Sequence, residues 1–191
     1  MRDAVIAGDI VGVRREAAIL ESESFPQLPD AWSYSVAQLQ YAAGQVALAA
    51  DLDEAAQWTA TMAVACGNCH RFSDQVPALD DQRPVEPPPE AETLDERMQR
   101  HAHIADDLWL GLLGSEPAWT RGAESLNEAP PQPTPADAAN VDEGFARELN
   151  QIKALGLQAL MARTLEKRAA VYGDLIARCA HCHPFARAGA P

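Results

Sequence analysis

Two short motifs of the same form hold all four cysteines of the chain. Residues 66–70 read Cys-Gly-Asn-Cys-His, and residues 179–183 read Cys-Ala-His-Cys-His. In a C-x-x-C-H motif the two thiols form thioether bonds to one porphyrin, and the histidine binds its iron. The sequence therefore predicts two covalently bound haem c groups. The expected attachment residues are Cys66, Cys69, Cys179 and Cys182, and the expected proximal iron ligands are His70 and His183.

The motif spacing suits a helix. Residues at positions i, i+3 and i+4 lie on one helical face, so both thiols and the imidazole of a motif point toward the same porphyrin. The composition agrees, because aromatic residues make up only 6% of the chain while Ala, Leu, Glu, Gln and Arg are plentiful. We expect an all-α protein with each motif on a helix.

Three other uses of paired cysteines fit the sequence less well. A shared zinc site usually has its two C-x-x-C pairs about 15–20 residues apart, whereas more than 100 residues separate Cys69 from Cys179. A thioredoxin-type redox motif expects a βαβ setting, which a helical chain does not offer. A disulfide within C-x-x-C on a continuous helix has strained geometry. Covalent haem is the interpretation that also uses both histidines.

The charge balance argues against several classes of partner. The chain has 15 Lys+Arg against 28 Asp+Glu, a formal net charge of −13. This acidity disfavours binding to nucleic acid or to an anionic membrane surface. No apolar run approaches the roughly 20 residues that span a bilayer. An acidic surface suits a redox partner protein with a basic docking patch.

The two halves of the chain read as repeats. Matching positions lie 106 residues apart early in the repeats and 113 residues apart later, where the two motifs also coincide. The expected organisation is a first haem-binding repeat at 1–83, a proline-rich linker at 84–92 and a second repeat at 93–191. The paired positions include Gly8 with Gly114, Leu20 with Leu126, Leu39 with Ile152, and Met62 with Leu175.

The second repeat reads as four helices, at about 94–113, after residues 115–117, after Asp142, and from about 164 to 183. The first repeat shows the last three of these but lacks nearly all of the first, because Met1 aligns with Asp107. In the helix at 94–113, inward positions recur at spacings of four and three, the pattern of a packed bundle seam. These positions are Leu94, Met98, His101, Ala105, Leu108 and Leu112.

This arrangement resembles the class II cytochromes c, the cytochrome c′ and c556 group, in which the haem motif lies on the fourth helix of a four-helix bundle. The resemblance implies two tandem four-helix-bundle-like cytochrome c′-type repeats, the first lacking most of its first helix. It covers most of residues 1–73 and 94–187. That family usually has an arginine soon after the haem histidine, and Arg187 fits this pattern whereas the run after His70 does not.

In the family that the chain resembles, the sixth position of the iron faces the first helix. A methionine or histidine there gives a six-coordinate haem suited to electron transfer, and an apolar residue leaves the iron open to NO or CO. For the second haem we expect His101 as the distal ligand, with Met98 as the alternative. His103 points roughly 200° around the helix from His101.

The first haem has no equivalent helix before it, and three interpretations stay open. Its iron is five-coordinate, or it takes His103 from the other repeat, or the chain begins inside a longer natural protein. We favour the last, because covalent haem attachment occurs outside the cytoplasm and no signal peptide opens the chain. The expected localisation is periplasmic or otherwise exported.

The sequence thus predicts a periplasmic dihaem c-type cytochrome that transfers electrons between redox partners. The alternative is gas binding or sensing, of NO or CO, at a five-coordinate haem. An enzyme such as a dihaem peroxidase or reductase is not expected. Such a site needs acid–base groups on the distal face, and none can be placed beside the first haem.

Overall fold

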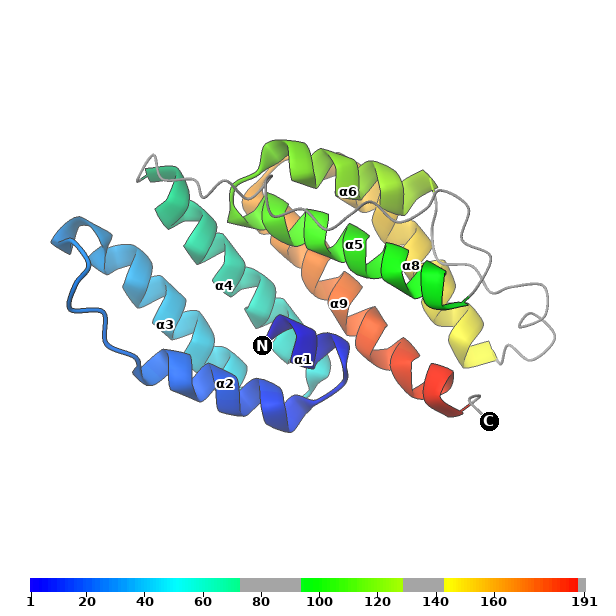
Figure 1. The fold of residues 1–191 in the computed structure, drawn as a ribbon, viewed down its shortest axis with the longest axis horizontal. Coiled ribbons are helices and arrows are strands. Elements are labelled where there is room, and N and C mark those ends of the chain that lie inside the picture. Colours follow the sequence, from blue (N-terminus) through cyan, green and yellow to red (C-terminus); the bar gives the residue numbers. More distant parts are fainter. Residues whose placement is uncertain (73–93, 129–142, 189–191) are drawn as a thin grey trace.

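Helices make up almost all of the chain that the computed structural model describes, which is residues 1–72, 94–128 and 143–188 (Figure 1). No strand occurs within these ranges, so the expected all-α class is confirmed. The expected linker at 84–92 and the prolines at 129–135 lie outside them. A search of the described helices for one with the length and hydropathy to cross a bilayer found none.

Four α-helices and a short 3₁₀ helix form the first half of the molecule, residues 1–72. They are α1 (Arg2–Ile6), α2 (Ile10–Ser22), the 3₁₀ helix at Asp30–Trp32, α3 (Ser33–Leu48) and α4 (Leu52–Phe72). Helix α2 packs on α1 and α3, and α3 packs on α4. The first helix of this half has only five residues.

Four helices form the second half, residues 94–188. They are α5 (Leu94–Leu113), α6 (Glu116–Glu128), α8 (Glu143–Met161) and α9 (Leu165–Ala188). Helix α5 packs on α6, α6 on α8, α8 on α9, and α9 on α5, so the four close around a shared interior. The bounds of α5 are those that the apolar spacing predicted.

The same turn follows the first helix of each half. Gly8 and Gly114 both have positive φ, +75° and +128°, a region that glycine adopts without a steric penalty. The next residues, Asp9 and Ser115, cap α2 and α6 by accepting hydrogen bonds from the backbone N–H three residues further on, at 2.9 and 3.3 Å. The two turns are 106 residues apart, the offset that the sequence gives for this part of the repeats.

Helices α4 and α9 lie side by side at the centre and run in opposite directions (Figure 1). Gln57 donates a hydrogen bond to Asp174 at 2.6 Å. One turn earlier on α4, Asp53 lies 3.3 Å from Arg178 and 3.0 Å from His181. The start of α4 therefore lies beside the C-x-x-C-H motif of α9, and the two motifs lie at opposite ends of the helix pair.

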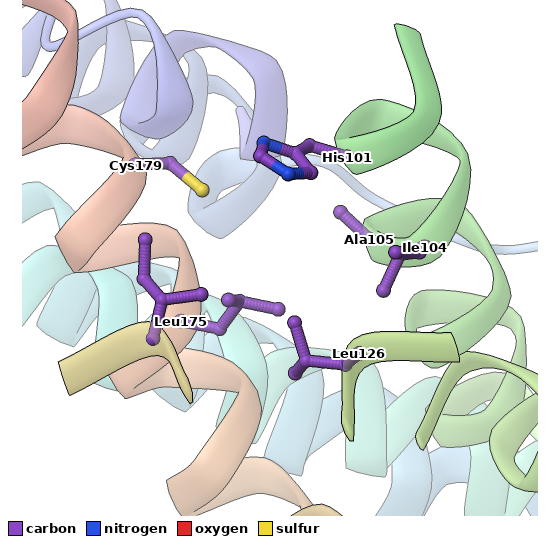
Figure 2. A pocket seen from close by; sticks show the side chains of 7 residues that line it. His101, Ile104, Ala105, Leu126, Leu175 and Cys179 are labelled. Carbon is purple, nitrogen blue, oxygen red and sulfur yellow. The ribbon is translucent and has the colours of Figure 1, made fainter. Parts of the chain in front are cut away.

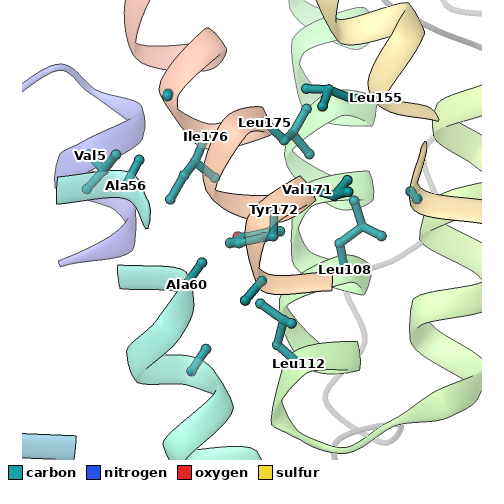
Figure 3. Close-up of a cluster of buried hydrophobic side chains, with 14 of the residues drawn as sticks. Val5, Ala56, Ala60, Leu108, Leu112, Leu155, Val171, Tyr172, Leu175 and Ile176 are labelled. Carbon is teal, nitrogen blue, oxygen red and sulfur yellow. The ribbon is translucent and has the colours of Figure 1, made fainter. Parts of the chain in front are cut away.

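Side chains from both halves form one buried apolar cluster, with Tyr172 of α9 in its middle (Figure 3). Val5, Ala56 and Ala60 reach it from the first half. Small alanines on α4 let its backbone approach α9 closely. Burying a valine or leucine stabilises a fold by about 1.5–3 kcal/mol, so this shared cluster holds the halves together. Its largest members from the second half are Ile104, Leu108, Leu112, Trp119, Leu126, Ile152, Leu155, Tyr172, Leu175 and Ile176.

Candidate functional site

Both C-x-x-C-H motifs lie on the C-terminal part of a continuous helix. In α4, Cys66, Cys69 and His70 share one face, because the helix continues to Phe72. Helix α9 includes the whole second motif and continues through Pro184 to Ala188, further than the expected end near residue 183. All four cysteines are free and partly buried. The side chain of His183 lies outside the described part of the structure.

Burial favours the protonated thiol at Cys66, Cys179 and Cys182. It raises the pKa of Cys179 to about 12, with a further contribution from neighbouring Cys182. Burial and Glu148 raise the pKa of Cys182 to about 11, and burial also raises the pKa of Cys66. Zinc binding and thiol–disulfide exchange both use thiolates. The raised thiol pKa values therefore disfavour both of these uses of the cysteines.

A small, partly open apolar cavity lies beside Cys179 and is lined by side chains of α5, α6, α8 and α9 (Figure 2). The imidazole of His101 and the thiol of Cys179 extend into it from opposite sides. The expected distal ligand and an expected attachment thiol of the second haem therefore line the same space. The lining residues are His101, Ile104, Ala105, Leu126, Ile152, Leu175 and Cys179.

The His101 imidazole is neutral at physiological pH. Burial lowers its pKa to about 4, and the positive charge of Arg100 adds to the effect. A neutral imidazole keeps a nitrogen lone pair free for an iron ion. Met98, the alternative ligand, is partly buried one turn earlier on α5 and is not among the described residues that line the cavity.

His103 lies on a different side of α5. Its Nε2 is 3.9 Å from Oδ2 of Asp107, and Asp107 in turn accepts a hydrogen bond from Arg121 of α6 at 3.1 Å. His103 therefore faces the ion pair that joins α5 to α6 rather than the cavity beside Cys179.

A smaller apolar cluster lies beside the first motif, which we call the Met62 cluster. Ala42, Ala43 and Met62 are buried in it, and Met1, Leu20, Leu39 and Trp109 pack against these three. Leu20, Leu39 and Met62 are the positions that the sequence offsets pair with Leu126, Ile152 and Leu175 of the cavity wall. Helices α2, α3 and α4 thus place apolar side chains near the first motif, as α6, α8 and α9 do near the second.

Two buried hydroxyl groups were not among the expected site residues. Thr59 and Tyr172 each lie seven residues before the first cysteine of a motif, on the same helical face. Both are completely buried, and the Thr59 hydroxyl has no hydrogen-bond partner within the described residues. The hydroxyl of Tyr172 lies near Arg2, and burial raises its pKa far above the ordinary value. The offset of 113 that pairs the motifs also pairs these two positions, and is the signal that could have found them.

The four thiols are not gathered in one place. Among the described residues no group of three or more His, Cys, Asp or Glu side chains is arranged to hold a metal ion. A zinc ion shared by the two cysteine pairs therefore has no support from the geometry.

Comparison with known proteins gave no match to a protein-family model, to a curated protein or to a solved structure.

Proposed function

We propose that the chain is a dihaem c-type cytochrome, built as two tandem repeats of the class II type, that transfers electrons between redox partners outside the cytoplasm. One observation carries the proposal. His101 and Cys179, selected from the sequence as iron ligand and attachment thiol, come from different helices and line one apolar cavity. Apolar walls around an iron centre exclude water, which helps to set its potential.

The repeat organisation has independent support. Gly8 and Gly114 occupy matching turns with positive φ. The Met62 cluster and the cavity beside Cys179 use side chains at matching offsets. Two equivalent walls, each next to a C-x-x-C-H motif, suit two equivalent cofactors.

The residues have separable roles in this proposal. Bound haem supplies a one-electron Fe(III)/Fe(II) couple. The four cysteines would hold the two groups covalently, and His70 and His183 would each bind an iron. His101 would be a further iron ligand at the second site, and two nitrogen ligands would give a lower potential than a nitrogen–thioether pair does. The apolar side chains of Leu126, Ile152 and Leu175 keep water away.

The surface charge fits docking to a basic protein. A net charge of −13 steers the chain toward a partner with a basic patch, at a rate that falls as ionic strength rises.

The alternative function is binding of NO or CO at the first haem. One observation favours it. Among the described residues, the Met62 cluster beside the first motif contains no imidazole, whereas His101 lines the cavity beside the second motif.

Adding CO to the reduced, intact protein separates the two functions. An electron carrier with two six-coordinate irons gives no spectral shift at either haem. A shift at one haem, assigned by its presence in a C179A/C182A variant and absence in a C66A/C69A variant, supports gas binding at the first site. A shift at both haems contradicts His101 as a distal ligand.

A further inference from the structure

Trp109 of α5 contacts both halves of the molecule. Its partly buried side chain packs against the main buried cluster and also against the Met62 cluster. Its ring centroid lies 5.7 Å from that of Tyr172 in α9, with the planes tilted by 42°. Among the described residues, it is the only side chain of the second half in the Met62 cluster.

The contacts of Trp109 join the surroundings of the two motifs. Met62 precedes Cys66 by one helical turn, about 6 Å along α4. Tyr172 precedes Cys179 by two turns, about 10 Å along α9. Trp109 therefore packs between a residue that lies one turn before the first motif and a residue that lies two turns before the second.

Helix α5 also touches the first motif directly. A Cβ atom added to Gly67, between the two cysteines, would lie 2.0 Å from the carbonyl oxygen of Leu112. This close backbone approach fixes α5 against α4 within the motif itself. Trp109 lies about one turn before Leu112 on α5, so its indole is held beside the part of α4 that leads into Cys66.

Arg2 contacts the indole, and an ion pair holds Arg2 in position. The guanidinium carbon of Arg2 lies 5.7 Å from the centroid of the Trp109 ring, within the range of a cation–π interaction. Arg2 also pairs with Asp106, three residues before Trp109 on α5, at 2.7 Å. Through Arg2, α1 of the first half thus contacts both the Trp109 indole and the neighbouring Asp106 of α5.

We propose that Trp109 is a positioning residue for the first haem. In this inference, which rests on the proposed function, the indole would form part of the apolar wall around the haem attached at Cys66 and Cys69. Helix α5 then serves both sites, with His101 facing the second haem and Trp109 facing the first. The indole excludes water from the first iron and so raises its potential.

The test compares W109A and W109F with the unmodified protein, using W58A as a matched control. Trp58 is also partly buried and packs on the main cluster, but it does not belong to the Met62 cluster. Each matured protein is first weighed to count its haems, and then titrated by spectroelectrochemistry. The second haem is identified as the one whose spectrum changes in H101A.

We expect W109A to shift the midpoint potential of the first haem to lower values and to leave the spectrum of the second haem unchanged. W109F should retain most of the unmodified potential, and W58A should change neither haem. Unchanged potentials in W109A, or an equal shift in W58A, would overturn the inference while leaving the dihaem function intact. A mass without haem in the unmodified protein would instead end the proposed function together with this inference.

Discussion

The surroundings of the two cysteine motifs match on one side and differ on the other. Both motifs lie late on a long helix, next to apolar residues at equivalent sequence positions. Beside Cys179 the opposite wall is formed by α5, which brings in His101. In the first half, α1 has only five residues. Beside the first motif, Trp109 from the other half packs against the Met62 cluster.

This difference separates two requirements of a haem site. Attachment depends on two thiols and a histidine on one helical face, and both halves satisfy it. The reactivity of the bound iron depends on what faces it from the other side, and there the halves diverge. We therefore expect the two sites to bind the same group and to use it differently.

Removing one cysteine pair has the largest expected effect. C66A/C69A should lose the first haem alone, and C179A/C182A should lose the second alone, because each group is held by its own pair of thioethers. The mass of the denatured, matured variants gives the number of haems retained. Loss of both haems from either variant would show that the sites are not independent, and an unchanged number of haems would exclude covalent attachment at these residues.

Replacing His101 by alanine should change only the second haem. The variant removes the imidazole opposite Cys179, so this iron is expected to become high-spin and to bind CO in the reduced state. Optical and electron paramagnetic resonance spectra would detect the change.

The matched control is H103A, two residues away on the same helix but beside Asp107. It should leave both haems as they are in the unmodified protein. A second haem that stays low-spin in H101A would remove this residue from the list of ligands, and a change at the first haem in H103A would restore His103 as its ligand.

The residue after the first cysteine of each motif distinguishes the halves sterically. Gly67 lies against the carbonyl oxygen of Leu112, at 2.0 Å from an added Cβ, whereas the equivalent Ala180 of α9 is accommodated and buried. G67A should lower the free energy of unfolding by about 1–3 kcal/mol, because α5 must move away from α4. A180G should cost about 1–2 kcal/mol, from helix propensity and from the loss of one buried methyl group.

Denaturant unfolding of the two variants provides the measurement. A G67A variant as stable as the unmodified protein would mean that α5 does not press on the first motif. A stable G67A would also weaken the placement of Trp109, since the two contacts depend on the same approach of α5 to α4.

The smallest expected effect concerns acid. Arg168 of α9 donates two hydrogen bonds of 2.6 Å to Glu116 of α6, which lowers the pKa of that carboxyl below its ordinary value of 4.5. The offsets pair these residues with Ile10 and Ala55, so the first half has no charge pair at these positions.

A folded-state pKa below the unfolded value means that the stabilisation is present above about pH 4.5 and is lost as pH falls through the folded-state pKa. E116Q should therefore cost at most about 1 kcal/mol at pH 7, since the carboxylate is largely exposed. The difference from the unmodified protein should shrink in acid. Unfolding curves at pH 7 and at pH values below 4.5 would test this, and a difference that persists in acid would assign the effect to packing.

The sequence was most informative where a local pattern determines the structure. The spacing of apolar residues predicted α5 at 94–113, and the same spacing placed His101 on the inner face, where it lines the cavity. The motif spacing predicted the helical setting of all four cysteines, which α4 and α9 provide.

Features that depend on distant contacts were not visible in the sequence. The antiparallel pairing of α4 with α9 rests on contacts such as Asp53 with Arg178, between residues far apart in the chain. Trp109 lies beside the seam of α5 and gave no sign that it packs against the other half. The end of α9 was misplaced because a proline usually ends a helix, whereas here the helix continues past Pro184.

The central claim is that each cysteine motif carries a covalently bound haem. Mass spectrometry of the denatured protein, produced in a host with an active c-type cytochrome maturation pathway and export signal, tests it most directly. The account predicts the mass of the polypeptide plus two haem groups. A mass equal to that of the polypeptide alone would contradict it.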